Sequence, residues 1–477
     1  MLKVLKPRRL PITTVRPLLI ATMAVLIVST LGVTALLARG RLGVTDAIFL
    51  VAAPWAFLAA AFKPDWLLIG LIALPASVTA SVQTSRALLL VGVALAALLI
   101  TRQRVTLGFR TGLAALVIVV IAGHLFQASV GEDASAVNRG AMLHLTYYIL
   151  LALLAFNLAV LGELHGGALG AALVLGVMST LIVGLAGYEN AWFEGGLGII
   201  THSYLAYMAA AALGVSLARL FMAQDVAGRR LGDFLITGIL LALVVLSVVR
   251  AAWIAAAITF ALIASRTRRR AYVLILMAAI ALALLTPTAR QEISRSESGN
   301  IVGQLRTGEI TTGRWELWLG LWERAQPALP WGNGFGYMWS LSSEDLLGTS
   351  GQFGSEESGV VAPHNDFVYL LVEFGIAGVL LLLLFWVQLF RARSLVSDSE
   401  DPLLRQSGSL LLGMIITGLM VALVDDVFAV RPFAERFFPV AGFIFGLAQV
   451  ERSWRRHPGP PGRLPEPPAL SALLPPA

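Results

Sequence analysis

Basic side chains lie at the ends of long apolar stretches of this sequence, where they could bind a phosphate. Arg250 stands between two apolar runs in SVVRAAW, Arg314 heads the segment RWELWLGLWERA, and His364 precedes an apolar run in APHNDF. The planar guanidinium of arginine binds two phosphate oxygens at once and keeps its charge near neutral pH. A histidine can take a proton from a hydroxyl group at neutral pH. Two arginines and a histidine on one face of a membrane would suit a reaction that releases an anionic phosphate group.

Each of these basic residues also has a structural explanation. An arginine at the end of a membrane span, such as Arg250, often anchors the span while its charge stays in water. Arg314 could be a surface charge. A histidine at the membrane interface, such as His364 or His202 in THSYLAYM, is often a hydrogen-bonding residue without a catalytic role. The sequence alone leaves both explanations open.

Acidic residues within the apolar runs also need a reason, because ionisable groups are costly inside a membrane. Glu373 lies inside the run that follows His364, and we expect it to be a structural hydrogen-bond partner within the bundle. Asp425 and Asp426 lie near the outer end of a later span and could simply face water. No cluster of His, Asp and Glu predicts a metal site, so we expect neither a metal nor another cofactor.

The composition is that of a membrane protein. Of 477 residues, 57% are hydrophobic and 13% charged, whereas soluble domains carry about 25% charged residues. The absence of cysteine excludes disulfides and thiolate chemistry. The net charge of +7 is explained by basic cytoplasmic loops, and we expect membrane lipids and no nucleic acid as partners. We predict an all-α polytopic membrane protein.

Stretches of about 20 apolar residues predict about 12–14 transmembrane helices. The candidate spans are 17–37, 44–62, 65–80, 86–101, 109–130, 141–161, 166–187, 197–221, 231–249, 251–265, 271–287, 366–390, 408–427 and 436–450. The basic loops, among them SRTRRR and ERSWRR, fall on one side, so both termini are predicted to be cytoplasmic. We expect a multi-pass membrane protein whose active face lies on the outer side, opposite the basic loops.

One hydrophilic insertion divides the chain. We predict a helix bundle at 1–287, a periplasmic loop at 288–363, C-terminal transmembrane helices at 364–450, and a disordered, proline-rich cytoplasmic tail at 451–477. Within the loop, the spacing of Trp315, Trp318 and Trp322 predicts an amphipathic helix that lies in the membrane interface. The segment WGNGFGYMW, which follows this helix, is predicted to form a tight turn.

Three motifs together resemble the O-antigen ligase and polymerase superfamily of bacterial membrane glycosyltransferases. APHNDFVYLLVEFGIAG is similar to the family's histidine–asparagine start of a span, and TTGRWELWLGLWERAQPALPWGNGFGYMW to its arginine–tryptophan helix and glycine-rich turn. VVLSVVRAAWIAAAITFALIA resembles its arginine at the outer start of a span, more loosely, because valine precedes Arg250 where the family commonly has serine. The resemblance covers about residues 197–390.

The resemblance implies a protein of the bacterial inner membrane that carries out an inverting, metal-independent glycan transfer at its periplasmic face. The donor would be an undecaprenyl-diphosphate-linked glycan, and the acceptor a lipid A-core sugar, another lipid-linked glycan or a protein hydroxyl. Arg250 and Arg314 would hold the diphosphate and neutralise its charge. His364 would activate the acceptor hydroxyl or orient the diphosphate, and His202 and Asn365 would contact substrate.

Other functions remain open at this point. A polymerase of the same superfamily differs from a ligase in its acceptor, which the residues do not reveal. A transporter or flippase of lipid-linked sugars would place charges near the middle of the membrane and break helices in paired positions. A non-catalytic assembly protein would not need arginines and a histidine on one face.

Overall fold

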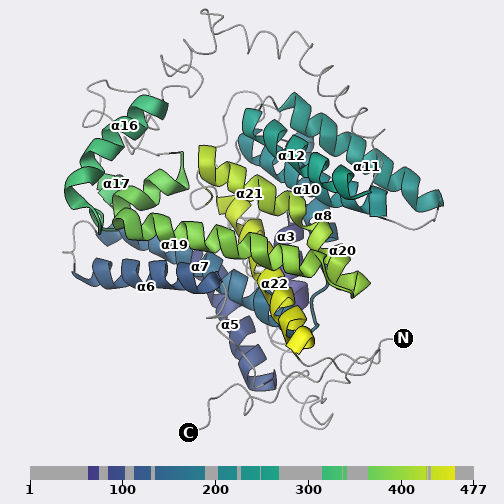
Figure 1. The fold of residues 1–477 in the computed structure, drawn as a ribbon, viewed down its shortest axis with the longest axis horizontal. Helices are drawn as coiled ribbons and strands as arrows, with labels where there is room; N and C mark the ends of the chain where they lie inside the picture. The colour runs from purple at the N-terminus through teal and green to yellow at the C-terminus, as the bar shows by residue number, and fades with distance from the viewer. Residues whose placement is uncertain are drawn as a thin grey trace, which may run out of the picture.

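The computed structural model describes most of the two halves of the chain on either side of the predicted loop. The described residues are 63–74, 84–102, 112–129, 135–187, 202–222, 227–247, 249–267, 314–335, 337–340, 364–425, 427 and 431–456. Every regular element in these ranges is a helix, which confirms the all-α prediction (Figure 1). The predicted spans at 17–37, 44–62 and 271–287 lie outside the described residues. Of the tail predicted as disordered at 451–477, residues 451–456 are helical because the last helix continues to Arg456, and 457–477 lie outside the described residues.

The helices follow the predicted spans closely. Their bounds are α3 Pro64–Ala73, α5 Thr84–Arg102, α6 Leu113–Ser129, α7 Ser135–Val160, α8 Gly166–Gly187, α10 His202–Met222, α11 Ala227–Leu246, α12 Arg250–Thr267, α16 Arg314–Ala325, the 3-10 turn η3 Gln326–Ala328, α17 Tyr337–Ser340, α19 Asp366–Ser397, α20 Pro402–Leu410, α21 Leu412–Val424 and α22 Arg431–Arg456. Among the described helices, five segments are long and apolar enough to cross a membrane: Met142–Val160, Tyr204–Phe221, Asp366–Ser397, Pro402–Val424 and Phe433–Arg456. The total number of spans stays a prediction.

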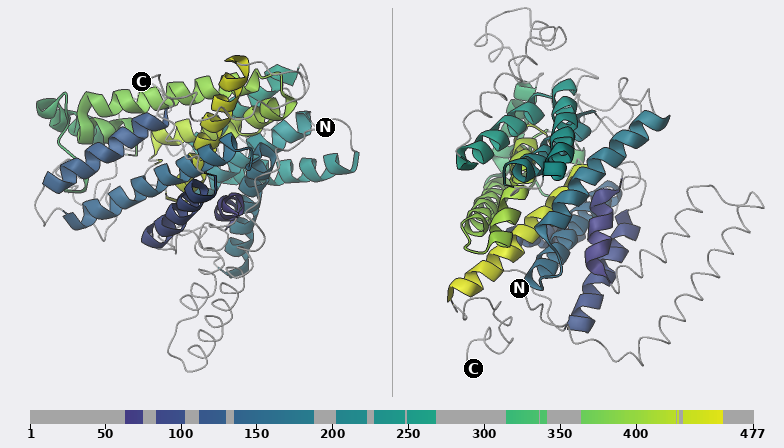
Figure 2. Two further views of the ribbon diagram at one scale, coloured as in Figure 1. Left: turned by 90° about the horizontal axis from the view of Figure 1, so that it is seen from below. Right: turned by 90° about the vertical axis from the view of Figure 1, so that its right-hand side faces the viewer.

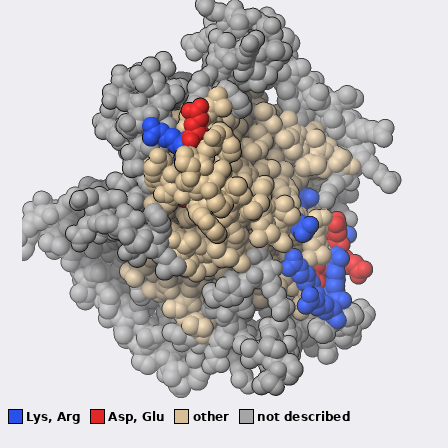
Figure 3. Space-filling view, turned by 60° about the vertical axis from the view of Figure 1, so that its left-hand side comes forward, with Lys and Arg blue, Asp and Glu red and all other residues tan. Residues whose placement is uncertain are grey.

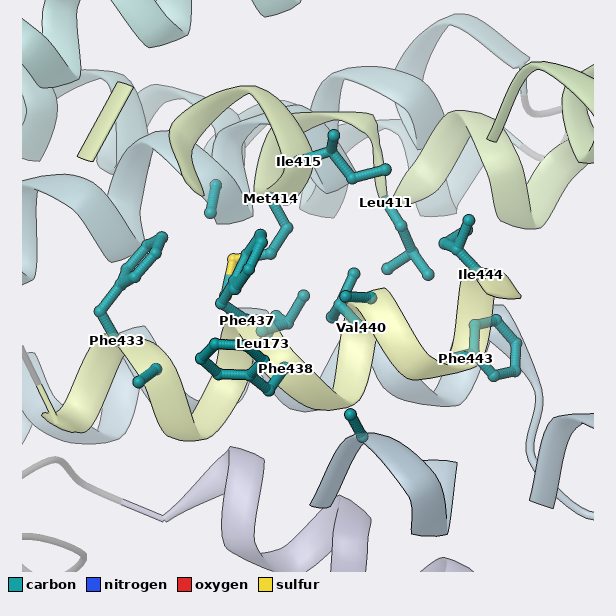
Figure 4. Close-up of a cluster of buried hydrophobic side chains, with 14 of the residues drawn as sticks. Leu173, Leu411, Met414, Ile415, Phe433, Phe437, Phe438, Val440, Phe443 and Ile444 are labelled. Carbon is teal, nitrogen blue, oxygen red and sulfur yellow. The ribbon is translucent and has the colours of Figure 1, made fainter. Parts of the chain in front are cut away.

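Helix α22 forms the centre of the bundle. It packs along α7 and also contacts α19, α21 and α3. The two views in Figure 2 show α22, in yellow, running among the blue helices of the N-terminal half. Phe385 of α19 packs against Phe437 and Phe445 of α22, and Phe437 faces Met414 of α21 in a cluster of buried apolar side chains (Figure 4). The aromatic contacts join the C-terminal helices to one another, and the packing of α22 along α7 joins them to the N-terminal half.

A fully buried arginine on α22 hydrogen-bonds the carbonyl groups at the C-terminal end of α3. Arg436 Nε donates to the carbonyl of Ile72 at 3.2 Å, and its Nη2 donates to the carbonyl of Leu74 at 2.5 Å. The predicted span at 65–80 is interrupted there, because Leu74 is extended (φ −65°, ψ 148°) and precedes Pro75 in the sequence. At ten residues α3 is about 15 Å long, roughly half the hydrocarbon thickness of a bilayer.

Helix α19 is divided by a kink. Gly375 has φ 64° and ψ −154°, a conformation open to glycine and costly for other residues. The predicted span at 366–390 is therefore two segments, Asp366–Phe374 and a longer helix after Gly375. The kink separates the start of α19, next to His364, from the part that packs on α22.

Candidate functional site

Helices begin at three of the basic residues that the sequence singles out. His202 is the first residue of α10, Arg250 of α12 and Arg314 of α16. The turn before Arg250 is short and well bonded, since Trp253 Nε1 and Ser247 Oγ each donate to the carbonyl of Val244 at 2.7 Å. Arg250 begins α12 shortly after the end of α11, and its place between two membrane spans stays a prediction. Helix N-termini carry a partial positive charge and favour anions, as the arginines themselves do.

His364 is held by a carboxylate from another helix. Its Nδ1 lies 3.2 Å from Oδ1 of Asp425, and the two side chains are 36% and 15% exposed. Among the described residues His364 is the only non-glycine residue with a positive φ, at 49°. Strained backbone of this kind persists where surrounding contacts hold it, often at functional sites. The contact with Asp425 thus orients the ring through Nδ1.

Asp425 joins three helices at one point. It follows the last residue of α21, and its Oδ2 accepts a hydrogen bond from the hydroxyl of Tyr207 on α10 at 3.2 Å. Tyr207 lies five residues after His202, so the start of α10 reaches the same place as the start of α19. From the sequence, Asp425 could simply have faced water, and Tyr207 was not among the predicted site residues. Asp426 lies outside the described residues.

Asn365 fixes the turn that presents His364. Its Oδ1 caps α19 by accepting from the backbone N–H groups of Phe367 and Val368 at 2.9 and 3.1 Å. Its Nδ2 donates to the carbonyl of Leu423 on α21 at 2.9 Å. These bonds give Asn365 a structural role beside Asp425, and the substrate contact expected of it stays a prediction.

The amphipathic helix of the predicted loop packs on the first segment of α19. Leu317, Leu321 and Ala325 of α16 are buried in a small cluster with Met338 and Val372. The prediction of a helix here is confirmed. The turn predicted at 331–339 is present at 331–335, and residues 337–339 belong to the short helix α17 from Tyr337.

Tryptophans lie on the exposed part of this outer segment. Trp322 of α16 and Trp331 of the turn are 43% and 78% exposed. Their location in the membrane interface stays a prediction.

The predicted glutamate also contacts this outer segment. Glu373 is fully buried, and its Oε1 accepts a hydrogen bond from the backbone N–H of Met338 at 2.9 Å. The structural role expected of Glu373 fits this contact. The donor of this hydrogen bond, Met338, belongs to the outer segment. A prediction of one continuous helix at 366–390 gave no indication of this contact.

Fold and surface together define an all-α, multi-pass membrane protein. Where residues are described, the face in Figure 3 is largely without Lys, Arg, Asp or Glu, and the charged side chains gather at two separate places. Residues 235–383 match the family described as O-antigen ligase, a range that contains Arg250, Arg314 and His364. This match supports membership of the O-antigen ligase/polymerase superfamily, a group of membrane glycosyltransferases that act on lipid-linked glycans. No curated protein matches the chain.

Proposed function

We propose that the protein transfers a glycan from an undecaprenyl-diphosphate carrier to a lipid A-core sugar at the periplasmic face of the inner membrane. The observation that carries this proposal is the contact between His364 Nδ1 and Asp425 Oδ1 at 3.2 Å. A carboxylate beside Nδ1 favours the tautomer with the proton on Nδ1 and the lone pair on Nε2, the arrangement of a histidine general base.

The reaction is a single displacement. The acceptor hydroxyl oxygen attacks the anomeric carbon of the donor glycan, and its proton passes to Nε2 of His364. The bond between the anomeric carbon and the phosphate oxygen breaks, its electron pair leaves with undecaprenyl diphosphate, and the configuration at the anomeric carbon inverts. Asp425 stabilises the imidazolium that forms, and Tyr207 holds Asp425 in place.

The leaving diphosphate requires positive charge at the same face. Arg250 and Arg314 supply it without a metal ion in this proposal, since each begins a helix whose N-terminus also favours an anion. His202, at the start of α10, and Asn365 make secondary contacts with the substrates. The contact between α10 and Asp425 supports this arrangement, because it brings the start of α10 next to His364.

The first test is glycan transfer by purified, full-length protein with a lipid-linked glycan donor. We expect His364→Ala and Arg314→Ala each to lower the rate by about 10²–10³. His165→Ala and Arg324→Ala are matched controls and should stay near the unmodified rate, since His165 is exposed between α7 and α8 and Arg324 lies at the far end of α16. Undiminished transfer by both site variants would contradict the assigned roles.

The acceptor is tested in a deletion strain. The description of the matched family favours a ligase. A ligase predicts that no glycan units remain attached to lipid A-core after deletion. Single attached units without long chains would identify a polymerase of the same superfamily instead. Donor movement across reconstituted vesicles without any new glycosidic bond would identify a transporter.

A further inference from the structure

The break in α19 is occupied by the glycine-rich turn. Because the helix is interrupted at Gly375, the last carbonyls of its first segment accept hydrogen bonds from elsewhere in the chain. The carbonyl of Val372 accepts from the backbone N–H of Asn333 at 2.9 Å, and that of Glu373 accepts from the N–H of Gly334 at 2.9 Å. Asn333 Nδ2 also donates to the carbonyl of Val372 at 3.3 Å. The turn and the helix end are joined through backbone groups.

Two glycines make this approach possible. Gly332 has φ 82°, and a Cβ there would collide with the backbone of Glu373 and Gly375. A Cβ on Gly375 would in turn collide with the carbonyl of Pro330. Both positions need a positive φ and have no room for a side chain. The turn and the kink can therefore pack this closely only with glycine at both positions.

Glu373 completes the same junction with its side chain. The carboxylate is fully buried, and its Oε1 accepts from the N–H of Met338 at 2.9 Å, just beyond the turn. The buried cluster of Leu317, Leu321 and Val372 lies along α16 and the first segment of α19. Backbone, carboxylate and apolar contacts therefore all join the outer segment 314–340 to residues 366–374.

We infer that Glu373 is a positioning residue that fastens the helix beginning at Arg314 to the helix segment beginning beside His364. We call this junction of Glu373 with the turn 331–335 the outer latch. The inference rests on the proposed function in its assignment of Arg314 and His364 to one reaction. Glu373 takes no part in proton transfer. Its carboxylate acts by keeping the diphosphate-binding arginine and the general base in fixed relation.

The absence of cysteine makes a direct readout possible. Leu321→Cys places one thiol in the buried face of α16, where it is protected from maleimide while the latch is closed. We expect Glu373→Ala to raise the labelling rate of this thiol at least about 10-fold, because the N–H of Met338 loses its buried acceptor. Glu373→Gln keeps an acceptor oxygen and should keep the thiol protected. Val372→Cys, equally buried, is the second reporter if Leu321→Cys does not fold.

Transfer by the same variants distinguishes positioning from chemistry. Glu373→Ala should lower kcat roughly 10-fold or more, and Glu373→Gln should restore most of it. Glu451→Ala is the matched control, because Glu451 is also buried but accepts hydrogen bonds from Ser399, between α19 and α20, and from Arg455, one turn further along α22. It should leave Leu321→Cys protected.

Two results would overturn the outer latch. In the first, Glu373→Ala leaves the thiol protected and kcat unchanged. In the second, Glu373→Gln transfers as slowly as Glu373→Ala while the thiol stays protected in both, which assigns Glu373 to the chemistry. Labelling needs no substrate, so it tests the latch even if His364→Ala retains full transfer and the proposed function fails.

Discussion

Nδ1 of His364 and Oδ1 of Asp425 lie 3.2 Å apart although 61 residues separate them in the chain. The contact joins the start of α19 to the end of α21. It is supported on both sides, by Asn365 bonding the carbonyl of Leu423 and by Tyr207 bonding the other oxygen of Asp425. The imidazole of His364 is therefore oriented before any substrate binds.

Asp425→Asn should lower kcat by about 10²–10⁴, the range of general acid–base catalysis. The amide can donate to Nδ1 and so favour the tautomer with its proton on Nε2, which cannot accept a proton from the acceptor hydroxyl. The measurement is the transfer rate of the purified protein at saturating donor. Asp398→Asn, at the exposed C-terminus of α19, is the control. A variant at position 425 with full kcat would exclude Asp425 as the orienting group.

Tyr207→Phe should slow transfer roughly 10-fold, since a hydrogen bond to a charged group contributes about 1.5–3 kcal/mol. The change removes one oxygen and keeps the ring that packs against Phe433. Because Tyr207 acts through Asp425, the double variant should be no slower than Asp425→Asn alone. Additive losses would show that Tyr207 acts by another route.

Arg314→Lys should lower transfer by about 10²–10³ even though the charge is kept. Lysine lacks the planar fork that binds two phosphate oxygens at once. Arg324→Lys makes the same change at the other end of α16 and should keep the rate of the unmodified protein. Equal transfer rates for Arg314→Lys and Arg324→Lys would show that Arg314 contributes no more than its positive charge.

Asn365→Ala should lower both stability and transfer. Loss of an N-cap costs about 0.5–2 kcal/mol, and here the tie to Leu423 is lost as well. Asp401→Ala removes a comparable cap, since Asp401 Oδ1 accepts from the N–H groups of Leu403 and Leu404 at the start of α20. We expect both variants to lower Tm, Asn365→Ala by more because the bond to Leu423 is also lost, and a large loss of kcat only for Asn365→Ala. Equal kcat values for Asn365→Ala and Asp401→Ala would show that the N-cap at Asn365 does not affect transfer.

Arg436→Met should lower Tm without changing a residue of the proposed site. The carbonyls of Ile72 and Leu74 would lose a buried donor, at about 1–3 kcal/mol for each group left unpaired. Arg455→Met, near the other end of α22, changes a half-exposed arginine and should shift Tm much less. Thermal unfolding in detergent measures both, and equal shifts would contradict this bonding role of Arg436.

Local patterns predicted the helices and the starts of several of them. Apolar runs of suitable length indicated α7, α10 and α22, and the polar residues at their ends indicated where α10, α12 and α16 begin. The amphipathic spacing of the tryptophans predicted α16. These features depend on neighbours within one helix or on transfer from water to lipid, so the order of residues is enough to predict them.

The kink and the short helix were harder to predict. Gly375 lies within an apolar run that reads as one continuous span, and its positive φ depends on the turn that docks against it. The end of α3 is bonded by Arg436, more than 350 residues later in the chain. Hydropathy carries no information about either partner.

Composition and apolar runs were enough to predict an all-α membrane protein, with Arg250 and Arg314 where helices begin and His364 just before one. That Asp425 and Tyr207 meet at His364, and that Glu373 bonds the outer segment, became visible in the packed helices. The physical reason is that propensity and hydrophobicity act along one segment, whereas a hydrogen bond between helices depends on how those helices pack. Such pairing is set by the whole bundle, so it appears only once the helices are assembled.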